Sequence, residues 1–174
     1  MAYNIIIYYM AIMLNSYTDF DTLFNMFESN PSSLFVKDGK SNNRFRFPRH
    51  KGGVYGIRKG RVDKVVGLSY LSNRYPDIFD ELCRIGDIIC PFQYTSIQVN
   101  RNLVCTPHKD SHNVGESILI SFGDYKGCNI VIDGKEYNAY HTPIMFNGSE
   151  LEHWNTPLES GIKYSLVFFQ MNFT

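Results

Sequence analysis

The chain has 174 residues, of which 44% are hydrophobic and 20% are charged, and its formal net charge is zero. This composition is ordinary for a soluble globular protein, and we expect a single domain over residues 1–174 with a sizeable core. The zero balance excludes a uniformly acidic or basic molecule, so the net charge alone indicates no partner.

The N-terminal segment, "MAYNIIIYYMAIML", is apolar. It lacks the basic start and the small-residue cleavage site of a secretory signal, and it is too short to span a bilayer. We therefore expect a buried strand or helix there and no membrane association. Because the four cysteines form no close CxxC pair, we also expect reduced thiols and an intracellular protein, cytoplasmic or nuclear.

Two helices are predicted in the first half of the chain. The stretch "YTDFDTLFNMFESN", with Thr18 or Asp19 as its cap, places four apolar residues on one helical face: Phe20, Leu23, Phe24 and Phe27. The stretch "SNRYPDIFDELCRIGDIIC" has Pro76 in its first turn and one apolar side: Ile78, Leu82, Ile85 and Ile89.

Between these helices lies a basic segment, residues 37–64. It holds ten of the 17 Lys and Arg residues and only two acidic ones, which leaves a local charge of +8. Its five glycines and Pro48 resist regular structure, so we expect a flexible loop or a twisted hairpin. A basic segment on a neutral protein indicates an anionic partner, with a solvated loop as the alternative.

From residue 91 the apolar residues follow the period of β-strands. Short apolar runs are separated by turns rich in Gly, Asp and Asn: "TSIQVNRN", "SILISFGD", "NIVIDG", "PIMFNG" and "KYSLVFFQMNF". In the first run one alternating pair faces inward: either Ile97 with Val99, or Gln98 with Asn100. We therefore predict an α+β fold, in which an N-terminal helical and basic-loop region (1–90) packs on a double-sheet β core (91–174).

The stretch "TPHKDSH" contains His108 and Asp110. Residues i and i+2 of an extended chain point to the same side, so these two side chains face one way. One imidazole and one carboxylate do not hold a divalent ion securely, and four other histidines are candidates for a third ligand: His50, His112, His141 and His153. The basic surroundings disfavour His50, and the step of about 6.5–7 Å between i and i+2 disfavours His112. His141 and His153, each next to a predicted strand, both remain candidates for the third ligand.

Two histidines and one carboxylate form the ligand set of non-haem Fe(II) oxygenases. The spacing His108-x-Asp110, then His153, then Lys163 in "KYSLVFF", resembles the Fe(II)/2-oxoglutarate-dependent dioxygenases over residues 92–172. The segments "GDYKG" and "YNAYHTPIMFNGSELEHWNTPLESGIKYSLVFF" are most similar to the branch of the TET and base J-binding proteins. That branch has Gly-Gly where this chain has Gly127–Cys128, and Arg in place of Lys163. The resemblance implies a double-stranded β-helix, or jelly roll.

The resemblance also implies three ligands for Fe(II), which form the catalytic centre: His108, Asp110 and His153. It implies that Lys163, assisted by the hydroxyl of Ser165, binds the far carboxylate of 2-oxoglutarate, and that Asn100 hydrogen-bonds the end of 2-oxoglutarate nearest the metal. The implied reaction uses dioxygen to convert 2-oxoglutarate to succinate and carbon dioxide while a C–H bond is hydroxylated.

Three functions are compatible with this sequence. The first is oxidation of a nucleic-acid base of the 5-methylpyrimidine type, in which Asn113 touches the substrate and four basic residues contact DNA or RNA: Arg44, Arg46, Arg58 and Lys59. The second is hydroxylation of a prolyl or other side chain in an acidic peptide or protein. The third is an iron-free β-domain that binds a partner, which the complete ligand set disfavours.

Overall fold

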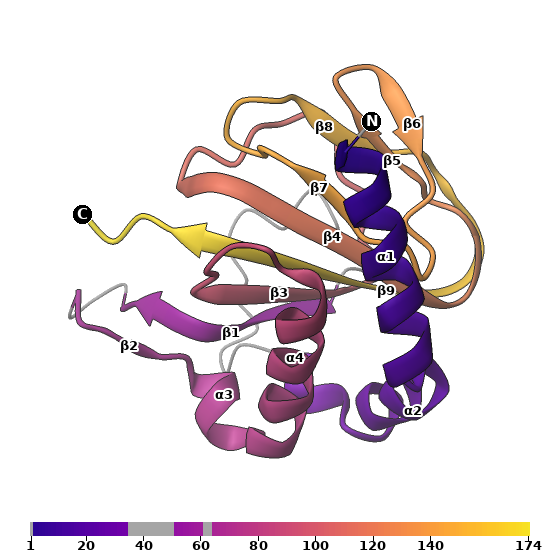
Figure 1. Cartoon of the computed structure of the whole chain (residues 1–174). Helices are drawn as coiled ribbons and strands as arrows, with labels where there is room; N and C mark the ends of the chain where they lie inside the picture. The colour runs from indigo at the N-terminus through magenta and orange to yellow at the C-terminus, as the bar shows by residue number, and fades with distance from the viewer. Residues whose placement is uncertain (1, 35–50, 61–63) are drawn as a thin grey trace.

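The computed structural model describes residues 2–34, 51–60 and 64–174. The helical elements in these ranges are α1 (Ala2–Tyr17), α2 (Phe20–Ser29), the 3-10 helix η1 (Pro31–Leu34), α3 (Tyr70–Arg74) and α4 (Pro76–Ile89). The strands are β1 (Lys51–Lys59), β2 (Val66–Leu68), β3 (Ser96–Arg101), β4 (Asn113–Gly127), β5 (Ile130–Ile132), β6 (Lys135–Tyr137), β7 (Ile144–Phe146), β8 (His153–Asn155) and β9 (Leu158–Met171). Figure 1 shows their arrangement.

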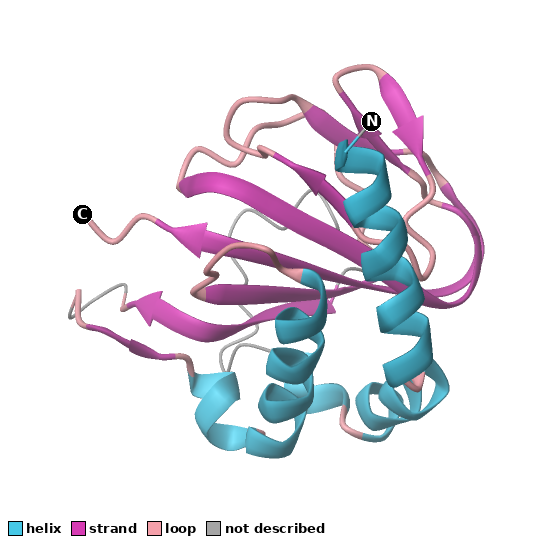
Figure 2. Cartoon of the chain, viewed as in Figure 1, coloured by secondary structure: helices cyan, strands magenta, loops and turns pink. Residues whose placement is uncertain are grey.

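The strands form two antiparallel sheets. The larger has the order β2-β1-β3-β9-β4-β7 and the smaller has the order β6-β5-β8. Side chains from both sheets form an apolar cluster between them: Leu119, Ile130, Ile132, Phe146, Leu151 and Val167. Two facing antiparallel sheets with helices at the N-terminus agree with the predicted α+β jelly roll (Figure 2).

One face of the large sheet is covered by the helices. Its apolar side chains, together with those of the helices, form the main core: Leu14, Leu23, Phe27, Leu82, Ile85, Ile97, Val99, Ile120, Phe122, Tyr164, Leu166 and Phe168. Asp19 caps α2, because its side chain accepts hydrogen bonds from the backbone N–H groups of Asp21 and Thr22. The predicted amphipathic helices therefore exist, although the second is divided into α3 and α4 at Tyr75.

The opposite face of the large sheet carries polar side chains. Asn100 of β3 pairs with Ser165 of β9, which pairs with Ser121 of β4, so the three point to the same face. All three side chains are buried. The predicted alternation in β3 is therefore present, with Ile97 and Val99 facing the helices and Asn100 facing the small sheet.

Part of the basic segment forms strand β1. Residues Ile57 to Lys59 of β1 pair with β2 in an antiparallel arrangement, and β1 also pairs with β3, which adds both strands to the large sheet. This agrees with the hairpin interpretation for these residues, while Arg44 and Arg46 lie outside the described residues. In the part of the chain that the structure describes, no helix is long and apolar enough to cross a membrane.

Candidate metal and co-substrate site

His108 and His153 lie directly opposite each other on adjacent chain segments. The backbone N–H of His108 donates to the carbonyl of His153 at 3.1 Å, and the reverse bond is 3.0 Å. Opposed residues of an antiparallel pair point to the same face, and the two imidazole centroids are 4.3 Å apart. The backbone N–H of Asp110 donates to the Gly148 carbonyl at 2.8 Å, which fixes the third residue beside them.

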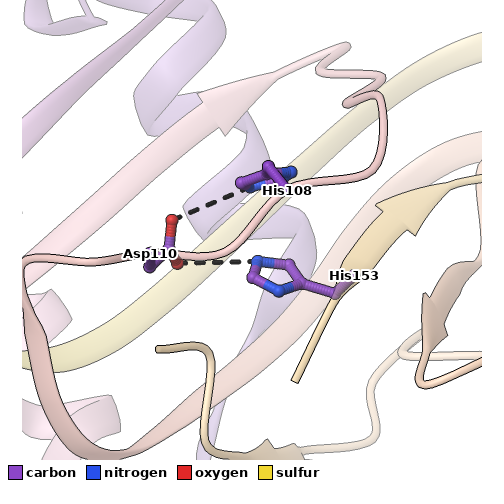
Figure 3. Close-up of side chains that lie close together, drawn as sticks. All are labelled: His108, Asp110 and His153. Atoms are coloured by element: carbon purple, nitrogen blue, oxygen red, sulfur yellow. Dashed lines mark ion pairs between the residues drawn. The ribbon is translucent and has the colours of Figure 1, made fainter. Parts of the chain in front are cut away.

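The three side chains converge on one point, as Figure 3 shows. Nε2 of His108 lies 3.7 Å from Oδ1 of Asp110, and Nε2 of His153 lies 3.5 Å from Oδ2. Two ligands with bonds near 2.1 Å to one ion are at most about 4.2 Å apart, so both pairs are close enough to share an ion. His153 is buried, whereas the His108 and Asp110 side chains are each 37% exposed, so that the triad is accessible from one side.

Hydrogen bonds to the backbone fix the orientation of both imidazoles. Nδ1 of His108 lies 2.8 Å from the Thr106 carbonyl oxygen, and Nδ1 of His153 lies 3.0 Å from that of Leu151. A carbonyl oxygen only accepts, so Nδ1 carries the proton of the neutral ring and Nε2 presents its lone pair to the shared point. Burial lowers the pKa of His153, but in the protonated ring Nε2 also carries a proton, and hydrogen bonds to Asp110 and Leu151 together with the charge of Asp110 stabilise that form and raise the pKa above the ordinary value.

Lys163 of β9 is buried, with an exposed fraction of 3%. Its ammonium donates a hydrogen bond to the carbonyl oxygen of Cys128 and lies 5.4 Å from the centre of the Tyr125 ring. Among the described residues, no carboxylate lies within 4.0 Å of this ammonium. Burial lowers the pKa of Lys163, and Cys128 and Cys105 partly oppose that shift. A buried ammonium without an ion pair provides a binding position for an anion.

The residues that we call the polar cluster are buried except for the half-buried Tyr125: Asn100, Ser121, Tyr125, Cys128, Lys163 and Ser165. Asn100 Nδ2 donates to Ser165 Oγ at 3.5 Å, and the Ser121 and Tyr125 hydroxyls are 2.8 Å apart. The triad adjoins the apolar cluster between the sheets, because Phe146 of that cluster contacts His153, and Val167, two residues after Ser165, packs against the same cluster. The structure therefore brings the predicted metal ligands and the predicted 2-oxoglutarate residues to the same side of the large sheet.

Comparisons with known proteins identify this architecture. No protein-family model matches the sequence, and no curated protein does either. The structure of NgTET1 in complex with 5mC DNA matches over 88% of this chain and 69% of that chain, at 14% identity and a TM-score of 0.59. OsALKBH1 matches over 87% of this chain and 92% of its own, at 11% identity and a TM-score of 0.51.

A third structure is an oxidoreductase of the 2OG-Fe(II) oxygenase family from Burkholderia pseudomallei. It matches over 69% of this chain and 65% of its own, at 17% identity, and its TM-score of 0.47 is too low to add to the argument. The first two similarities decide the architecture. The chain has the fold of the Fe(II)/2-oxoglutarate dioxygenases. The predicted jelly roll and the predicted resemblance are therefore confirmed at the level of the fold.

Within the dioxygenase fold, two further residues support the carboxylate of Asp110. Nδ2 of Asn113 donates to Oδ2 of Asp110 at 3.3 Å, so the structure places Asn113 against a proposed ligand, and its contact with a substrate stays a prediction. Gly148 lies close to the same carboxylate: a Cβ atom added to this glycine would be 3.2 Å from Oδ2 of Asp110 and 3.5 Å from Cε1 of His153. The turn sequence "NGSELE" indicates a glycine there, but it does not indicate this contact.

The remaining predicted residues lie elsewhere. Arg58 and Lys59 are at the end of β1, and the Lys59 ammonium donates to the Phe173 carbonyl at 2.9 Å. His141 is stacked between Phe20 and the ring of Tyr140, with centroid distances of 3.9 and 4.0 Å. Its ring is therefore held outside the triad of the dioxygenase fold.

Proposed function

We propose that the chain is a non-haem Fe(II)- and 2-oxoglutarate-dependent dioxygenase that hydroxylates a C–H bond. The observation that carries the proposal is the combination of the convergent triad of His108, Asp110 and His153 with the buried ammonium of Lys163, which has no ion pair with any carboxylate of the described residues. The donor set of two neutral imidazoles and one carboxylate fits Fe(II) and leaves positions for further ligands. The direct test is iron-dependent release of succinate from 2-oxoglutarate, measured by mass spectrometry.

Each residue has a separate role in this proposal. The three triad side chains hold the iron, which when bound activates dioxygen and couples decarboxylation of 2-oxoglutarate to substrate hydroxylation. Lys163 binds the far carboxylate of 2-oxoglutarate, and its burial strengthens that ion pair because little water competes. Ser165 donates its hydroxyl to the same carboxylate, and Asn100 is positioned by Ser165 to hydrogen-bond the other end of the molecule.

Asn113 is expected to strengthen metal binding through its hydrogen bond to Asp110. Because partners of metal ligands typically contribute 10- to 100-fold to affinity, Asn113→Ala should weaken Mn(II) binding by about tenfold. Isothermal titration calorimetry of the purified chain measures this directly. Ser111→Ala, at an exposed position of the same turn, is the control and should bind Mn(II) as the wild type does; equal affinities for all three proteins would contradict the role of Asn113.

For the substrate, we propose a nucleic-acid base of the 5-methylpyrimidine type. Two observations support this choice: the local charge of +8 over residues 37–64, and the fold shared with NgTET1, which was solved with 5mC DNA. A base in a duplex must be extruded to reach a buried centre, and basic side chains can stabilise the phosphates on either side. A screen of methylated oligonucleotides and acidic peptides by mass spectrometry tests it, since oxidation of peptides alone would indicate a protein hydroxylase.

Nucleic-acid binding is expected to depend on salt. The logarithm of the affinity should fall linearly with the logarithm of the salt concentration, and each lost phosphate contact should reduce the slope by about 0.9. The slope should flatten when the four basic residues predicted to contact phosphates are neutralised together: Arg44, Arg46, Arg58 and Lys59. Fluorescence anisotropy with a labelled oligonucleotide measures the slope, and Lys126→Ala with Lys135→Ala, at exposed positions outside the segment, is the control. If the affinity of the wild type did not change with the salt concentration, nucleic acid would be excluded as the partner.

A further inference from the structure

Lys163 and Cys128 form a buried contact between the two sheets. The Lys163 ammonium donates to the Cys128 carbonyl oxygen and lies 3.5 Å from Cys128 Sγ. The exposed fractions of the two residues are 3% and 0%. Tyr125 bounds the ammonium with its ring, and the hydroxyl of Tyr125 is hydrogen-bonded to Ser121 at 2.8 Å. The position of the ammonium is therefore limited by the thiol on one side and by a fixed ring on another.

The thiol itself is held rigidly. Cys128 follows Gly127 in the turn between β4 and β5, and both residues have positive φ angles, +56° and +74° respectively. The backbone N–H of Cys128 donates to the Pro157 carbonyl at 2.8 Å, and its Sγ donates to the Leu103 carbonyl at 3.3 Å. A left-handed φ disfavours any residue other than glycine, so a side chain at this position, directed at the proposed co-substrate cation, indicates a function for the thiol.

We propose that Cys128 sets the length of the dicarboxylate that Lys163 binds, an inference that depends on the proposed function. The thiol occupies the space next to the ammonium, so neither Lys163 nor a longer ligand can move into it. A 2-oxo acid with one more methylene, 2-oxoadipate, would press its far carboxylate against this side of the cluster. One methylene in a rigid site changes binding by about 10- to 200-fold, so Cys128 is a specificity-determining residue.

The test compares the binding of 2-oxoglutarate and 2-oxoadipate to the full chain loaded with Mn(II), by calorimetry. Cys128→Ala should reduce the preference for 2-oxoglutarate by about tenfold, whereas Cys128→Ser, which keeps a polar atom of similar size, should retain it. An unchanged ratio in the alanine variant overturns the role of Cys128. A wild-type chain that binds neither acid overturns the proposed function itself, so the two failures are distinguishable.

A second measurement tests the contact between Lys163 and Cys128 by enlarging the cation instead of removing the thiol. It does not depend on the folding of the single Cys128 variants. Lys163→Arg places a longer cation against the thiol and should weaken 2-oxoglutarate binding by about tenfold, and adding Cys128→Ala should restore it, because residues in contact are energetically coupled. Circular dichroism confirms that each variant is folded. Equal weakening in the single and the double variant would overturn the proposal.

Discussion

Replacement of His108 by alanine is expected to reduce succinate release by more than about 100-fold. Loss of a partner that only orients a metal ligand costs about 10- to 100-fold, and His108 supplies one of the three donor atoms itself. The remaining pair, Asp110 and His153, lie 3.5 Å apart and form only two of the three contacts that the site offers to an ion. Succinate formation with Fe(II), 2-oxoglutarate and substrate is measured by mass spectrometry, and Mn(II) binding by calorimetry.

The matched control is His112→Ala. His112 has an exposed side chain and lies four residues after His108 in the same segment, but it does not belong to the convergent triad. Its removal should leave both succinate release and Mn(II) binding close to those of the wild type. Full turnover of His108→Ala would show that the assigned ligand set is wrong.

Replacement of Lys163 by methionine is expected to have two opposite effects. Affinity for 2-oxoglutarate should fall by about 30-fold or more, because removal of one partner of a buried charge pair costs roughly 2–5 kcal/mol. The melting temperature of the ligand-free protein should rise, because methionine fills a similar volume and removes a buried charge that has no ion pair with the described residues. Calorimetry measures the first effect and thermal denaturation followed by circular dichroism measures the second.

The lowered pKa of Lys163 fixes the sign of the pH effect. Between this lowered pKa and the ordinary value of 10.5, the folded wild-type protein binds fewer protons than the unfolded one, so its stability rises with pH. The advantage of Lys163→Met is therefore largest below the lowered pKa and shrinks as the pH approaches 10.5. Lys126→Met, at an exposed position of β4, should show neither effect. A methionine variant that melts earlier and still binds 2-oxoglutarate normally would contradict the assigned role.

The common direction of His108 and Asp110 could be predicted because it depends on local sequence, while their role as metal ligands stays a prediction. The i, i+2 spacing of His108 and Asp110 fixes their common direction in an extended chain. The third ligand could not be chosen by spacing, since His141 and His153 both adjoin strands. The structure separates them: His153 is paired through its backbone with His108, whereas His141 is held in a stack with Phe20.

The contact between Cys128 and Lys163 could not be predicted in this way. The two residues are 35 positions apart, and they meet only because the turn before β5 packs over β9. They are also the two positions at which the chain departs from the pattern of the dioxygenase branch that it resembles, and the sequence gives no sign that these departures are in contact. Such contacts depend on how two sheets pack, which strand periodicity does not determine.

Strand β1 could not be predicted with certainty from the sequence, for a different reason. Its glycines indicate a loop, yet an added Cβ at Gly53 would lie 2.1 Å from Cδ1 of Leu71, so the glycine is needed for close packing of α3 on the strand. Residue types that usually interrupt a strand can thus be required by a neighbouring helix. The hairpin alternative was correct for the part of the basic segment that the structure describes.

The two faces of strand β9 differ in function, and this has a consequence for which of its residues can be substituted. Tyr164, Leu166 and Phe168 belong to the helix-covered core, whereas Lys163 and Ser165 belong to the polar cluster. Val167, on the same face, packs in the apolar cluster between the sheets, so a directed-evolution library confined to positions 163 and 165 would vary ligand selectivity while the other positions continue to fold the domain. At these two positions, the residue types available for new chemistry are largely independent of those required for folding.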